Sequence, residues 1–177
     1  MRAGTKQRLG GLAQRGYCAS LKRWFHGVKE HLIFTPGGNI AFVLQMPGNR
    51  HDVQGLYALM KTSFTGTLLA DSAYWPKERK REKLEEKGIK VLAQTRSNWR
   101  FRHPKRISSL IEKERSQIDR RIGLFNAQFN AGRTLCRSPK HHEARRVAKA
   151  LAHNISRRIN KQHRFRKESV AHFHLVA

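Results

Sequence analysis

Acidic residues are scarce in this chain and absent from its first part. The 177 residues carry 37 lysines and arginines against 12 aspartates and glutamates, a formal net charge of +25, and the first acid is Glu30. A basic excess of this size requires a polyanionic partner, for which nucleic acid is the default candidate. Charge alone does not distinguish a DNA-binding protein from a small structural RNA-binding protein.

Cysteine and long apolar runs are also scarce. With only two cysteines, Cys18 and Cys136, the chain cannot form a disulfide scaffold or a zinc knuckle. No apolar run approaches the roughly 18 residues that a membrane-spanning helix needs, so we expect no membrane association. No secretory hydrophobic region stands out, and we expect a cytoplasmic protein.

The apolar content is nevertheless sufficient for a folded core. Apolar residues make up 38% of the sequence, and its length favours one domain over two. We expect a basic N-terminal arm over residues 1–23, a folded domain over residues 24–162 and a basic tail over residues 163–177.

Two short apolar runs predict a β-hairpin in the first third of the chain. Residues 31–34 and 40–44 are apolar, and the five residues between them, 35–39, are turn formers. A second turn over residues 47–50 ends the hairpin. Asp52 then stands where the N-cap of a following helix is expected.

The middle of the chain alternates strands and helices. Residues 67–71 form a short apolar run that ends in a carboxylate, and this pattern indicates a buried central strand. Pro76 and Gly88 mark the first turn and the end of the next helix, and residues 89–93 read as another strand.

The last part of the chain is expected to be helical. Apolar residues recur there at helical spacing in two stripes, the first made of Ile107, Leu110, Ile111 and Ile118, the second of Val147, Leu151, Ile155 and Ile159. Arginine and lysine cover the rest of the second helix. The order of elements predicts a mixed α/β domain with a helical C-terminal part.

Two carboxylates are the best candidates for chemistry. Asp71 ends an apolar strand, and Glu112 lies beside Ile111 on a helix. The simpler interpretation is that Asp71 caps the next element and that Glu112 pairs with Arg115 or Lys113. Together, however, two carboxylates in a chain so poor in acids could share a divalent cation such as Mg²⁺, which prefers oxygen ligands. Two such ions about 4 Å apart support phosphodiester chemistry.

Several short motifs, in order along the chain, resemble bacterial insertion-sequence transposases of the Asp-Asp-Glu type. The similar segments cover roughly residues 16–160, and they are Trp24-Phe25-His26-Gly27-Val28-Lys29, Pro47-Gly48-Asn49-Arg50-His51-Asp52, Leu69-Ala70-Asp71-Ser72-Ala73-Tyr74, Ile111-Glu112, Arg133-Thr134-Leu135-Cys136-Arg137-Ser138 and Ala148-Lys149-Ala150-Leu151-Ala152-His153-Asn154.

The resemblance implies a ribonuclease H-like mixed sheet flanked by helices, and DNA strand cleavage and transfer at insertion-sequence ends with Mg²⁺ or Mn²⁺. In this family Asp71 would be the second carboxylate of the triad and Glu112 the third, both as catalytic residues and as metal ligands. The family's first aspartate lies upstream of the Trp24 segment, where residues 1–29 contain no acid. Asp52 is the only substitute between Glu30 and Asp71, and its position suits a helix cap better.

The missing acid makes us expect a truncated transposase, incomplete at the N-terminal strand, whose status as an enzyme stays open. Self-association or an N-terminal fragment could complete the site. The alternative is a non-catalytic basic nucleic-acid-binding protein, either a DNA-binding remnant or a ribosomal-type RNA binder. The two carboxylates discriminate between these functions, because a scaffold gains nothing from carboxylates that face its polyanion.

Basic residues near the end of the predicted domain are candidates for DNA contacts. Trp99 and Phe101 lie among them on a predicted loop, where they could stack on unpaired bases; equally, one of the two rings could simply anchor a solvated loop. The candidate DNA-binding residues are Arg96, Arg100, Arg102, Lys105, Arg115, Arg120, Arg145 and Arg146.

Overall fold

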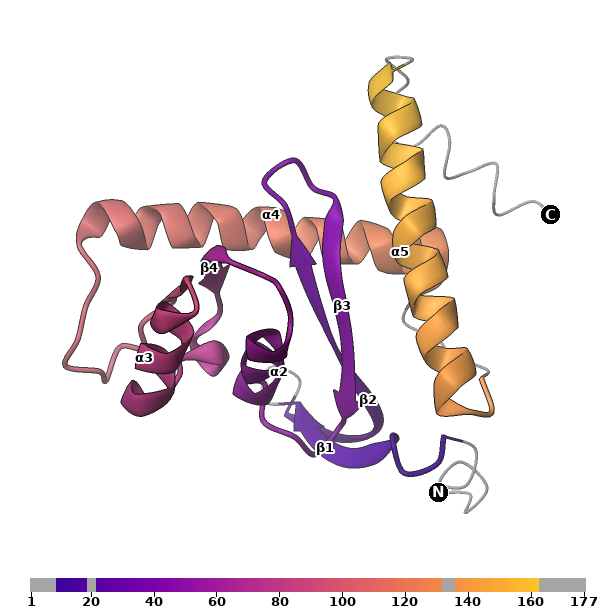
Figure 1. Cartoon of the computed structure of the whole chain (residues 1–177), viewed down its shortest axis with the longest axis horizontal. Coiled ribbons are helices and arrows are strands. Elements are labelled where there is room, and N and C mark those ends of the chain that lie inside the picture. Colours follow the sequence, from indigo (N-terminus) through magenta and orange to yellow (C-terminus); the bar gives the residue numbers. More distant parts are fainter. Residues whose placement is uncertain (1–8, 19–21, 132–135, 163–177) are drawn as a thin grey trace. The chain divides into compact units, whose positions relative to one another are not determined.

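A computed structural model describes residues 9–18, 22–131 and 136–162 (Figure 1). Its elements in chain order are β1 (Gln14–Cys18), β2 (Arg23–Phe34), β3 (Ile40–Pro47), α2 (Val53–Ala58), the 3₁₀ helix η1 (Leu59–Lys61), β4 (Gly66–Ala70), the 3₁₀ helix η2 (Ser72–Tyr74), α3 (Glu78–Glu86), β5 (Ile89–Ala93), α4 (Lys105–Phe129) and α5 (Pro139–Gln162). The mixed α/β class is confirmed.

The chain divides into two compact units rather than forming one. Unit 1 combines Met1–Arg50 with Arg121–Ala177, and unit 2 is the continuous segment His51–Arg120. The last part of α4 therefore belongs to unit 1 and its first part to unit 2. Among the described residues, no helix is long and apolar enough to cross a bilayer.

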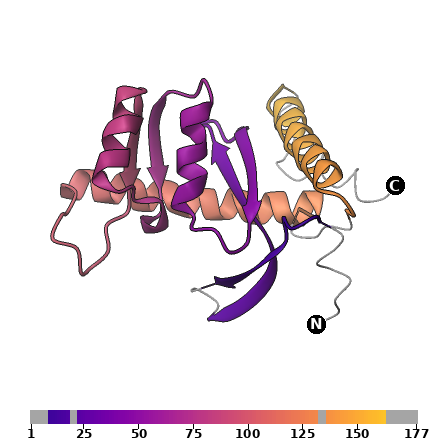
Figure 2. The same ribbon diagram turned by 60° about the horizontal axis from the view of Figure 1, so that its bottom comes forward.

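Unit 1 contains a three-stranded antiparallel sheet in the order β1-β2-β3. The expected hairpin is confirmed, with a turn in which the Gly38 N–H donates to the Thr35 carbonyl, 2.8 Å. β2 is longer than expected, and its first half pairs with β1, from Gln14↔Gly27 to Cys18↔Arg23 (Figure 2). β1 lies within residues 1–23, which were expected to form a basic arm. The basic, glycine-rich sequence there does not alternate apolar and polar residues, so it does not indicate a strand.

The core of unit 1 lies among the hairpin, the end of α4 and α5. Its members are Ile40, Phe125, Ala131 and Ala150, with Leu32, Phe34, Val43 and Phe129 packed against them. The apolar stripe of α5 does not face this core, because Val147, Leu151 and Ile155 are 44%, 56% and 57% exposed.

The reason lies in the edge of β3, whose backbone groups attract polar side chains of α5. Asn154 accepts from the Ile40 N–H at 2.8 Å and donates to the Ile40 carbonyl at 2.9 Å. His153 Nε2 lies 3.2 Å from the Gly38 carbonyl, and Arg157 donates to the Gly37 carbonyl. Unpaired backbone groups of an edge strand are costly when buried, so the helix face that satisfies them packs inward.

Unit 2 has an apolar core built around a parallel pair of strands. β4 and β5 pair from Gly66↔Ile89 to Ala70↔Ala93. β5 has the expected bounds, and α3 ends just before Gly88, whose φ of 78° suits glycine. The expectation that β4 is a buried central strand is wrong: it has one strand neighbour among the described residues and stays partly exposed. The buried residues are Leu56, Leu59, Leu84, Ile89, Val91, Ala93 and Ile111.

Candidate catalytic carboxylates and nucleic-acid surface

Asp71 lies directly after β4, at the carboxyl end of the parallel pair. Ligands of open α/β sheets bind at this edge. Its side chain accepts a hydrogen bond from the Ser72 N–H and so caps η2, as the simpler interpretation predicts. The carboxylate is still 45% exposed, which leaves it accessible for a second role.

Arg115 links Asp71 to a carboxylate that the sequence did not single out. Its Nη2 lies 3.8 Å from Asp71 Oδ2, and its Nε lies 3.9 Å from Asp119 Oδ2. The same guanidinium donates to Gln94 Oε1. The four-residue spacing of Arg115 and Asp119 on a helix is the signal that could have revealed this pair.

Glu112 lies on the same side of α4 as Asp119. The two residues are seven positions apart, two helical turns or about 10.5 Å along the axis, with Arg115 between them. Glu112 is exposed, next to the buried Ile111, and within the described part of the chain it forms no ion pair. Arg115 thus links Asp71 to the side of α4 that carries two carboxylates, Glu112 and Asp119.

The negative charges of Asp52 and Asp71 both affect the pKa of the Tyr74 hydroxyl. Burial raises the pKa of Tyr74 above its ordinary value, and the negative charges of Asp52 and Asp71 raise it further. Asp52 stands at the N-cap position of α2 as expected, but its side chain forms no cap hydrogen bond. Helix capping therefore does not account for this carboxylate.

The described residues do not fit a complete divalent-metal site. They contain no group of three or more His, Cys, Asp or Glu side chains close enough to hold an ion. Asp71 instead forms an ion pair with Arg115. A hard divalent ion needs several oxygen ligands, so Asp71 and one carboxylate of α4 are too few by themselves.

The expected DNA-contacting residues of unit 2 are exposed on the loop that follows β5 and on α4. Arg102 donates to the carbonyls of Arg96 and Ser97, which fixes the loop, while Arg96 Nε lies 3.4 Å from Ser72 Oγ. No acidic residue lies between Gln94 and Arg106. The exposed basic residues are Arg96, Arg100, Arg102, Lys105, Arg106, Arg115 and Arg120, and in unit 1 Arg145 is exposed as well.

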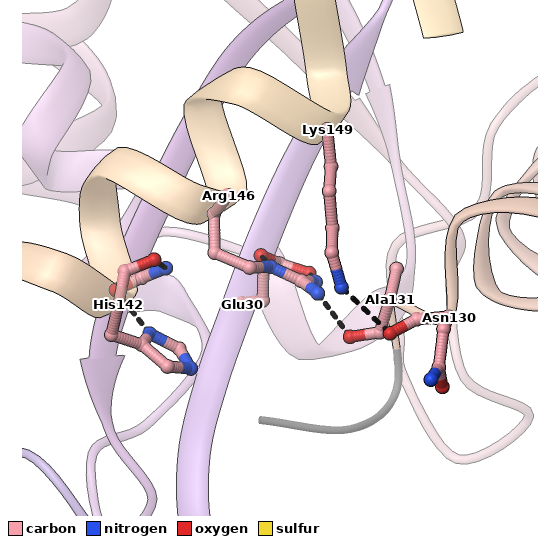
Figure 3. A network of polar contacts seen from close by, with 7 residues as sticks. Glu30, Asn130, Ala131, His142, Arg146 and Lys149 are labelled. Carbon is pink, nitrogen blue, oxygen red and sulfur yellow. Dashed lines mark hydrogen bonds and ion pairs between the residues drawn. The ribbon is translucent and has the colours of Figure 1, made fainter. Parts of the chain in front are cut away.

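Arg146 does not belong to this surface. It is 7% exposed, it forms a two-pronged ion pair with Glu30, and it donates to the Ala131 carbonyl (Figure 3). Burial lowers its pKa to about 10. Lys149 donates to the Asn130 carbonyl beside it at 2.7 Å. The sequence placed Arg146 on the polar side of α5, whereas that side faces the sheet.

Residues 2–155 match the family described as the transposase DDE domain. The chain belongs to this family. No curated protein and no solved structure matches the chain. Membership supports a transposase-type function with DNA as the partner, and a divalent metal is typical of the family. The resemblance inferred from the short motifs is thereby confirmed.

Proposed function

We propose that this transposase domain binds DNA at the ends of an insertion sequence and that Asp71 and Glu112 are two carboxylates of its strand-cleavage site. The observation that carries the proposal is the position of Asp71 at the carboxyl end of β4, linked by Arg115 to the carboxylate-bearing side of α4. We further propose that the fold is ribonuclease H-like. The parallel strand pair and the antiparallel hairpin support that assignment.

We propose Mg²⁺ or Mn²⁺ as the metal and two-metal phosphoryl transfer as the complete family reaction. Within the part of the chain that the structure describes, too few carboxylates surround Asp71 for that chemistry, and residues 1–29 contain no acid. We therefore propose that the protein is a truncated copy of a transposase, which retains DNA binding and by itself cleaves DNA weakly or not at all.

DNA binding is tested by the salt dependence of the dissociation constant of the purified chain on a duplex. Phosphate contacts release counterions, so a surface with six to ten contacts loses roughly 10³–10⁵-fold in affinity between 50 and 200 mM salt. Arg100→Ala and Arg120→Ala should each flatten the slope, because both side chains are exposed. A salt-insensitive affinity contradicts the proposal.

The carboxylates are tested by Mn²⁺ binding and by nicking of supercoiled DNA. The two carboxylates of the incomplete site should bind Mn²⁺ only weakly, and Asp71→Asn and Glu112→Gln should each weaken that binding further, whereas Glu114→Gln, on the opposite side of α4, should not. Asp119→Asn tests whether Asp119, which shares Arg115 with Asp71, contributes more to Mn²⁺ binding than Glu112 does. Vigorous Mg²⁺-dependent cleavage by the chain alone would contradict the incomplete site.

A separate polypeptide that carries the family's first aspartate should complete the site if complementation occurs. Adding such a fragment to the purified chain should then restore nicking in wild type and not in Asp71→Asn. Asp52→Asn provides the control for a substitute within this chain: if Asp52 supplies the missing carboxylate, this variant should lose the residual nicking that the wild-type chain shows without the fragment.

A further inference from the structure

Four rings form a connected cluster on unit 2, beside Asp71. Trp75 follows η2, and its ring centroid lies 5.2 Å from that of Trp99 and 5.5 Å from that of Phe101. His103 closes the cluster at 5.0 Å from Phe101. Three of these rings come from the loop between β5 and α4, which has no regular secondary structure of its own.

The cluster is tied to the carboxylate site by short connections. Trp75 lies four residues after Asp71, and η2 fills the gap between them. From the loop side, Arg96 reaches Ser72, the residue next to Asp71, while its guanidinium carbon lies 5.8 Å from the Trp99 ring centroid. The rings and the carboxylate thus belong to one local assembly.

The cluster is not a closed core. Phe101 is 51% exposed, and Trp75, Trp99 and His103 are only partly buried. His103 Nε2 lies 2.9 Å from the Ala93 carbonyl and helps to anchor the loop, whereas the side chain of Phe101 remains half exposed to solvent. The stretch of sequence that supplies three of the rings, residues 96–106, contains no acid and five basic residues: Arg96, Arg100, Arg102, Lys105 and Arg106.

We propose that the Trp75–Trp99–Phe101 cluster is a stacking site for an unpaired base of the DNA strand that passes Asp71. The inference rests on the proposed DNA-binding function and adds the chemical form of the substrate. Open aromatic faces among arginines bind single strands because every base has a face to stack, and the cations hold the phosphates. In an intact duplex both faces of a base are covered, so the site selects DNA with unpaired nucleotides.

The test compares three fluorescent DNA probes bound to the full chain at one salt concentration. They are a duplex, the same duplex with a six-nucleotide single-stranded extension, and the same extension made of abasic nucleotides. The last two carry equal phosphate charge, so their difference isolates the bases. We expect the base-bearing extension to bind about 10-fold more tightly than the abasic one, within the usual range for stacking on aromatic residues.

Phe101→Ala should abolish this preference, leave duplex binding unchanged and recover with Phe101→Tyr. Trp24→Ala is the matched control, because Trp24 is 57% exposed and Arg15 lies over its ring, yet it belongs to unit 1. Equal affinity for base-bearing and abasic extensions, or an equal loss in Trp24→Ala, overturns the stacking site. Absence of duplex binding overturns the proposed function instead.

Discussion

Unit 1 and unit 2 both have an apolar core, but only unit 1 also buries polar and charged side chains among its described residues. Unit 1 buries His142, Arg146 and His153 between a helix and a sheet edge. Unit 2 buries aliphatic side chains such as Leu84 and Ile89, and none of its described charged side chains is fully buried. The comparison teaches that the basic residues of this chain have two uses: some secure the fold of unit 1, and others on unit 2 remain available to a polyanion.

The largest loss of stability, and the clearest difference between the two units, is expected from Arg146→Met in unit 1. Removing one partner of a buried ion pair leaves Glu30 uncompensated and costs about 3–5 kcal/mol. The double variant Glu30→Leu/Arg146→Met should recover most of that loss, because no buried charge remains. Urea unfolding measures both free energies. A double variant less stable than the single one would refute the assignment of the loss to the unpaired charge.

The next largest loss of stability is expected from overpacking the buried face of α5. Ala150 is 6% exposed against the hairpin, so Ala150→Leu should cost about 1–3 kcal/mol. Leu151→Ala, one residue along, should change the free energy of unfolding by less than about 0.5 kcal/mol, because Leu151 is 56% exposed. The reverse ranking in thermal unfolding would mean that the apolar stripe of α5 faces the core.

Mild acid should weaken unit 1 selectively. Burial lowers the pKa values of His142 and His153, so the unfolded chain binds protons more readily than the folded one. Stability is therefore complete above pH about 6.5 and falls as the pH drops below it. Hydrogen exchange at pH 7.5 and 5.5 should show faster opening of β2 and β3 than of β4 and β5. His153→Gln should reduce that difference, and an unchanged difference would exclude His153 as its source.

Among the variants that break an ion pair, the smallest loss of stability is expected from Arg115→Ala in unit 2. Its ion pairs with Asp71 and Asp119 involve side chains that are 45–69% exposed, so their loss should cost less than about 1 kcal/mol. The same change removes a positive charge beside Asp71 and should strengthen Mn²⁺ binding, measured by calorimetry. A stability loss as large as that of Arg146→Met would show that the exposed ion pairs of Arg115 contribute as much as the buried pair of Arg146.

The sequence predicted those parts of the fold that local chemistry determines. Turn formers located the hairpin, the apolar run at residues 67–70 located Asp71 at a strand end, and Gly88 marked the end of α3. The order of motifs identified the family.

Nonlocal contacts explain what the sequence did not reveal. The spacing of Val147, Leu151 and Ile155 indicated an apolar face correctly, but it could not show that the facing surface is a polar strand edge. Arg146 was misplaced for the same reason, since Glu30 lies 116 residues earlier. Asp119 was overlooked because only the structure brings Asp71 to Arg115.

The bonds from Asn154 and His153 to Ile40 and Gly38 also govern the order in which a newly made chain can fold. Gly38 and Ile40 leave the ribosome more than 110 residues before His153 and Asn154, to which they bond. At 5–20 residues per second this interval is on the order of 10 s. During that time unit 2, the continuous segment His51–Arg120, emerges. The edge of β3 stays open meanwhile, and a nascent chain is then most exposed to pairing with the wrong strand.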